Sequence, residues 1–145
     1  TAIDAGGVVT LRHATIVTDQ AAITLESGGA LDAANSVLDG TTAIVAAKGA
    51  PWTRASALAF QTGTTFVDAN GTTATTDDDL LNLGCGSCLI VDIPTLVDDT
   101  GHLTAASPND LVDNADATLA LPDDIDGDLR PQGAGPDIGC DELIP

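Results

Sequence analysis

A weak repeat with a spacing of about 22 residues restricts the fold of this chain more than any other feature. Residues 9–16 align with residues 31–38, so that His13 falls at the same repeat position as Asn35. Each phrase alternates apolar and polar side chains, as a strand with one buried face does, and Gly-rich turns separate the phrases. The sequence therefore predicts an all-β solenoid of short parallel strands. A leucine-rich-repeat solenoid has a similar period, but its L-x-x-L-x-L-x-x-N phrase is missing.

The hydrophobic residues of the chain are small, which suits a narrow and repetitive interior. Much of the 43% hydrophobic share is alanine, and the only aromatic residues are Trp52, Phe60 and Phe66. No segment is long and apolar enough to cross a bilayer, so membrane insertion is not expected.

Acidic residues outnumber basic ones by 22 to 4, which gives a formal net charge of −18. Nucleic acid is excluded as a partner, because phosphate binding needs clustered Lys and Arg side chains. The same negative charge favours solubility in water outside the cell and repels anionic surfaces unless divalent cations bridge them.

The C-terminal tail carries two short motifs. Residues 124–131 read D-x-D-G-x-x-R-P, and residues 137–142 read D-I-G-x-x-E with Cys140 at the fourth position. This ending resembles that of bacterial secreted right-handed parallel β-helix surface proteins, which are pectate-lyase-like and of the choice-of-anchor type. The similarity extends upstream to residue 92.

That resemblance implies a right-handed parallel β-helix with an irregular C-terminal cap. Residues 1–91 would form the coils, and residues 92–145 would form the terminal coil and the cap of the same domain. A cap is physically required, because the last coil of a β-helix otherwise exposes unpaired backbone groups. The resemblance also implies an extracellular or cell-surface location.

Three carboxylates lie close together around a Gly turn in the tail. Asp124, Asp126 and Asp128 offer oxygen ligands of the kind that calcium prefers, although Gly127 falls too early for an EF-hand loop. The alternative is a structural turn in which Arg130 clamps Asp137 or Asp141, and the family resemblance favours this alternative. No other cofactor is expected.

The three cysteines predict a disulfide in an oxidising compartment. The preferred pairing joins Cys140 to Cys88 or Cys85 and ties the tail to the body, and a bond between Cys85 and Cys88 is the competing connectivity. A zinc site would need four ligands, and neither His13 nor His102 lies in a supporting motif.

Catalysis has little support in the sequence. Arg12, Lys48 or Arg54 could serve as the base of a polysaccharide lyase, yet none lies in a lyase-like phrase. Trp52 is the single strong candidate for stacking on a sugar, and it is expected on a loop. No catalytic residue is predicted.

We expect a non-catalytic structural or adhesive module that assembles end to end. The alternatives are a fragment of a carbohydrate-active enzyme, either a polysaccharide lyase or a glycosidase, and a calcium-dependent binding module. The absence of Met and the abrupt start at Thr1 predict a trimmed or longer precursor. The N-terminal coil would then be covered by upstream coils, by another chain or by a second copy, and a glycan or surface ligand is a further expected partner.

Overall fold

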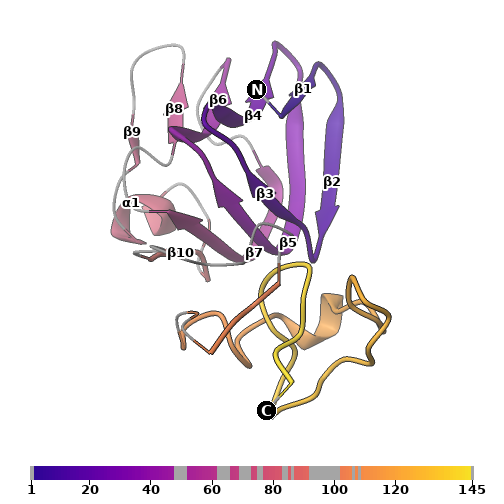
Figure 1. Ribbon diagram of the computed structural model, residues 1–145. Coiled ribbons are helices and arrows are strands. Elements are labelled where there is room, and N and C mark those ends of the chain that lie inside the picture. The colour runs from indigo at the N-terminus through magenta and orange to yellow at the C-terminus, as the bar shows by residue number, and fades with distance from the viewer. Residues whose placement is uncertain are drawn as a thin grey trace.

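A computed structural model describes residues 2–47, 52–61, 66–68, 73–74, 77–82, 85, 87–91, 102–105, 107 and 109–144. They form two β-sheets with a loop-rich C-terminal tail beside them, coloured orange to yellow in Figure 1. The first sheet has the strand order β1-β4-β6-β8-β9. Its strands are β1 (Ile3–Ala5), β4 (Ala21–Leu25), β6 (Thr42–Ala46), β8 (Phe66–Asp68) and β9 (Thr73–Ala74).

The second sheet has the order β10-β7-β5-β2, and a further strand, β3, pairs with β5 beyond the end of β2. Its strands are β2 (Val8–Arg12), β3 (Thr15–Val17), β5 (Ala30–Asp39), β7 (Trp52–Gln61) and β10 (Leu89–Val91). Two short helices complete the described structure, α1 (Asp77–Asn82) before β10 and the 3-10 helix η1 (Ala117–Leu119) in the tail. None of the helices in the described ranges is long and apolar enough to span a membrane.

Most neighbouring strands are parallel, as the alternating phrases predict. Val9 pairs with Leu31 in the register of β2 against β5, and this is the alignment visible in the sequence. Ile23 of β4 pairs in the same way with Ile44 of β6. The repeat in the sequence therefore reports which residues lie side by side on neighbouring strands.

The predicted right-handed β-helix is nevertheless wrong. The described strands form two separate sheets and no closed solenoid with coils of about 22 residues. Paired residues are 20 positions apart at Ile3 and Ile23 but 30 apart at Ala59 and Leu89, so no constant coil length exists. The first sheet also ends in an antiparallel pair, β8 with β9. The repeat fixes the local register, but it does not fix the path between the sheets.

The main core lies between the two sheets and consists mainly of Ile, Leu and Ala side chains. Its buried members include Ile23, Leu31 and Ile44, together with the fully buried aromatic side chain of Phe60. Trp52 lies in β7 and packs against this core, so it is not the loop residue that we expected. Trp52 pairs with Leu31 of β5, and the register of the two strands shifts between Leu31 and Asp32.

Three residues with left-handed backbone conformation lie in one row across the second sheet. His13, Asn35 and Ala57 have φ angles of 47°, 54° and 49°. His13 falls between β2 and β3, whereas the other two lie inside β5 and β7. Side chains before and after this row therefore face different surroundings, and the row is where the tail docks.

A second, smaller core joins the tail to the second sheet. Val37, Ala57 and Ala59 of the sheet pack there with residues of the tail, which are Leu103, Leu111 and Ile138. The tail thus runs across successive strands of the second sheet, below the sheets in Figure 1. The prediction that the tail forms an irregular cap over an end coil is therefore wrong, because the tail packs against strands of the second sheet. The boundary expected between residues 91 and 92 borders residues 92–101, which lie outside the described residues.

Candidate functional site

Asn35 connects the tail to the row of left-handed residues. Its Oδ1 accepts a hydrogen bond from the Asp116 amide at 2.6 Å, and its Nδ2 donates to the Asp116 carbonyl at 3.0 Å. The same Nδ2 group lies 3.0 Å from Nε2 of His13. Because the amide nitrogen can only donate, Nε2 of His13 must be the acceptor.

His13 is consequently held as a neutral ring. Its Nδ1 lies 3.2 Å from the Gly139 carbonyl oxygen and donates to it, so both ring nitrogens are occupied. Burial, with the positive charge of Arg130 nearby, lowers the pKa of His13 to about 4. The ring therefore has no free nitrogen with which to act as a base.

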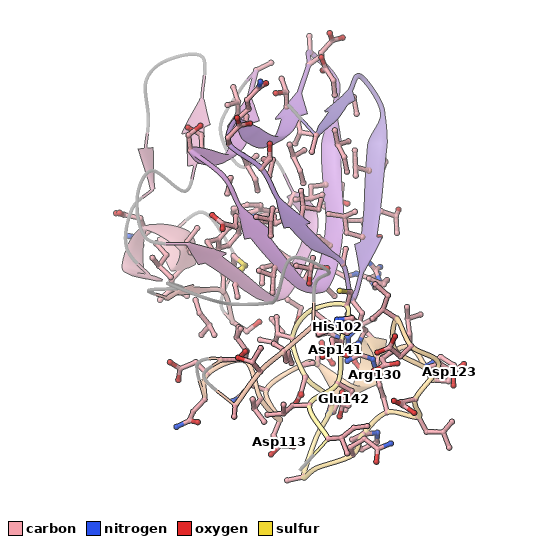
Figure 2. All side chains as sticks on the ribbon, in the orientation of Figure 1. His102, Asp113, Asp123, Arg130, Asp141 and Glu142 are labelled. Carbon is pink, nitrogen blue, oxygen red and sulfur yellow. A yellow bond between two sulfur atoms is a disulfide. The ribbon has the colours of Figure 1, made fainter. Side chains whose placement is uncertain are left out.

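Arg130 lies at the centre of the tail in Figure 2 and pairs with Glu142. Nη1 of Arg130 lies 2.9 Å from Oε2 of Glu142, and both side chains are almost completely buried. The guanidinium also donates to the carbonyl oxygens of Asp137 and Gly139. The expectation that Arg130 clamps the carboxylate of Asp137 or Asp141 is therefore wrong, because those two carboxylates have backbone partners.

Asp137 and Asp141 hold loops in place through backbone amides. The Asp137 carboxylate accepts from the amides of Asp113 and Leu143, both at 2.7 Å. The Asp141 carboxylate accepts from the Leu103 amide, also at 2.7 Å. Burial raises the pKa of each of these two carboxyl groups.

The acidic turn at Asp124 is organised in the same way. Oδ1 of Asp124 accepts from the amides of Asp126 and Asp128, and Oδ2 accepts from the Glu142 amide. Burial acts to raise the pKa of Asp124, but the amide hydrogen bonds outweigh it and the pKa is lowered. Asp124 thus holds the turn through backbone amides, whereas the structural alternative had expected Arg130 to stabilise it.

The structure gathers a different set of residues as possible metal ligands. In the described part of the chain, ligand atoms of His102, Asp126 and Asp141 lie within 4.8 Å of one another, whereas Asp124, Asp126 and Asp128 form no such group. Nε2 of His102 lies 3.0 Å from Oδ2 of Asp126. His102 and Asp141 can be found by their labels in Figure 2. The predicted calcium site at the three aspartates stays a prediction.

The disulfide joins Cys85 to Cys88, with 5.5 Å between their Cα atoms. This is the competing connectivity, and it replaces the preferred bond from Cys140 to either of them. Cys85 and Cys88 both lie in the core between the sheets. Cys140 lies in the docked tail instead, where its backbone amide donates a hydrogen bond to the Thr15 hydroxyl.

Arg12 and Arg54, the two described basic residues outside the tail, both lie near Asp32 of β5. Asp32 of β5 accepts from Arg12 at 2.7 Å and lies 3.6 Å from Nε of Arg54. Lys48 lies outside the described residues.

The second candidate site is the open end, which we define as the free edges of β1, β2 and β3. Among the described strands, β1 and β2 are terminal in their sheets, and β3 pairs on one side with β5 alone. Val8 and Val17 are 65% and 58% exposed there. Ile3, Leu11 and Ile16 are only partly buried against the main core, so this end of the molecule is apolar as well as unpaired.

Sequence reasoning missed Glu142 and Asp116, which hold the tail together. Glu142 is part of the D-I-G-x-x-E motif, but three acids in six residues gave no means of choosing the partner of Arg130. The alignment of His13 with Asn35 was the available indication of a docking row. Comparison with known proteins shows no family for this chain, since no family model, curated protein or solved structure matches it.

Proposed function

We propose that this chain is a non-catalytic structural or adhesive module that associates through its open end. The observation that carries the proposal is the coincidence of two unpaired sheet edges with partly buried apolar side chains at one end of the molecule. Unpaired strand edges are templates for pairing, and natural proteins usually protect them with charges, proline or a covering segment.

The tail supports a structural role. The carboxylates of Asp124, Asp137 and Asp141 and the buried pair of Arg130 with Glu142 all engage backbone groups or each other. Such groups fix loops in position and are poorly suited to transfer protons to a substrate. An extracellular or cell-surface location agrees with the Cys85–Cys88 disulfide, since disulfides persist in oxidising compartments.

Sedimentation velocity over a range of protein concentrations tests the proposal. We expect the wild-type chain to form a larger species as concentration rises and Val8→Lys to shift this transition at least ten-fold to higher concentration, because a charge at an edge opposes pairing. Leu129→Lys is the matched control, because Leu129 is 67% exposed but lies in the tail. A wild-type chain that stays monomeric up to millimolar concentration, or equal effects of the two variants, would overturn the proposal.

A further inference from the structure

Three side chains from separate segments of the tail meet at one place. One ring nitrogen of His102 and one carboxylate oxygen each of Asp126 and Asp141 lie within 4.8 Å of one another. The closest approach that involves the ring is 3.0 Å, between Nε2 of His102 and Oδ2 of Asp126. The labels of His102 and Asp141 lie one above the other in Figure 2, beside that of Arg130. An imidazole and two carboxylates thus converge from three loops.

Backbone hydrogen bonds fix these three loops relative to one another. The Leu103 amide, next to His102, donates to the Asp141 carboxylate at 2.7 Å. The Ile125 amide, which precedes the second of the three residues, donates to the carbonyl oxygen of Cys140 at 2.9 Å. Each of these bonds lies beside one of the converging side chains. The three side chains are therefore held close together by the fold itself, which is the arrangement that a preformed ligand set requires.

The charges around this group favour a cation. The carboxyl group of Asp124 hydrogen-bonds to that of Asp141, which brings a third acid beside the two in the group. The nearby positive charge of Arg130 is engaged by Glu142 at 2.9 Å. Carboxylates at such short separation repel one another unless a proton or a cation lies between them. A divalent ion here would reduce that repulsion in a chain with a net charge of −18.

The imidazole determines which class of ion fits. Calcium takes oxygen ligands, whereas imidazole nitrogen suits zinc and its neighbours among the transition metals. Zinc binds nitrogen and carboxylate oxygen at about 2.0–2.2 Å, so two of its ligands lie about 3.0–3.5 Å apart in octahedral and tetrahedral sites alike. The 3.0 Å between His102 and Asp126 already meets this requirement. Asp126 is 57% exposed, so its side chain can turn to complete the set with Asp141.

We propose that His102, Asp126 and Asp141 form a binding site for a divalent transition-metal ion of the zinc type. The ion replaces the proton that Nε2 of His102 shares with Asp126, and that proton leaves to water. Water completes the coordination, because the His102 side chain is 31% exposed. The bound ion ties three loops of the tail together. This site differs from the predicted calcium site, which lacks a histidine, and it does not depend on association through the open end.

Calorimetric titration of zinc into the untagged full chain at neutral pH tests the site. The chain carries Cys140→Ser, which removes the thiol outside the disulfide. We expect one ion per chain and at least ten-fold weaker binding by His102→Gln and by Asp126→Asn, because each loses a ligand. Asp123→Asn is the matched control, since Asp123 is an exposed acid of the same turn and its loss changes the charge equally. Its affinity should change less than two-fold.

Thermal melting gives a second readout, because an ion that binds only the folded chain raises the melting temperature. Zinc should raise it in the parent and in Asp123→Asn but not in His102→Gln, and circular dichroism of the metal-free variants checks that they fold. Unchanged binding by His102→Gln, or calcium bound as tightly as zinc, would show that the imidazole is no ligand. Equal losses in Asp126→Asn and Asp123→Asn would show diffuse attraction alone. Each of these results, or zinc binding weaker than millimolar, would overturn the proposal.

Discussion

Replacement of Arg130 by methionine tests whether the tail is held by its buried ion pair. Arg130 and Glu142 have side-chain exposures of 1% and 0%, so their charges are screened very little by water. Methionine preserves much of the apolar stem and removes the guanidinium. The Glu142 carboxylate would then keep two donors, the amides of Gln132 and Asp137, but no opposite charge.

The expected loss is large compared with the stability of a small domain. Removing one partner of a buried ion pair costs about 3–5 kcal/mol, because the remaining charge is uncompensated. The carbonyls of Asp137 and Gly139 also lose a donor, at about 1 kcal/mol each where water does not replace it. We therefore expect Arg130→Met to lower the free energy of unfolding by about 4 kcal/mol or more, out of a typical total of about 5–15 kcal/mol.

Urea denaturation followed by circular dichroism measures this loss, and Trp52 fluorescence reports on the sheets separately because Trp52 packs against the main core. Arg54→Met is the control, since Arg54 is about half exposed and 3.6 Å from Asp32, and exposed pairs contribute about 0–1 kcal/mol. A loss below about 1 kcal/mol for Arg130→Met, equal to that of the control, would refute the account of the tail.

Three further predictions concern the tail. Because the folded pKa of His13 is about 4 and its ordinary value is 6.5, stability is complete above pH 6.5 and falls by about 3 kcal/mol as the pH drops to 4. His13→Asn should remove that loss in denaturation experiments across this range. Gly139→Ala should cost about 2 kcal/mol and Gly127→Ala about 1 kcal/mol by thermal melting, because both have positive φ but a Cβ at Gly139 meets Thr15 at 3.1 Å, whereas one at Gly127 meets nothing within 4 Å. Asp124→Ala should lower the melting temperature equally with calcium and with EDTA, because its partners are backbone amides; a loss seen only with calcium would support the calcium site instead.

The parallel pairing could be predicted from sequence because it depends on local patterns. Alternation of apolar residues marks the strands, and equal spacing places Val9 beside Leu31. The course of the chain between the sheets could not be predicted in this way, since it depends on turns and on the insertion before β10. A resemblance in the last residues therefore suggested a closed β-helix that the strands do not form.

The position of the tail was beyond sequence reasoning for a different reason. It depends on long-range contacts such as that between Asn35 and Asp116, which no spacing rule connects. The partner of Arg130 was missed because Asp137, Asp141 and Glu142 are chemically equivalent candidates on an irregular loop. The disulfide follows the shortest separation, and both of its cysteines lie in the main core.

Residue-resolved hydrogen exchange of β2 at low and high protein concentration tests the open end most directly. The account predicts that the amides of Val9 and Leu11, which bond to β5, are protected at every concentration. The amides of Val8, Thr10 and Arg12, which alternate with them and face the open end, should become at least ten-fold slower to exchange as the concentration rises. Rapid exchange of these three amides at all concentrations would contradict association through the β2 edge of the open end.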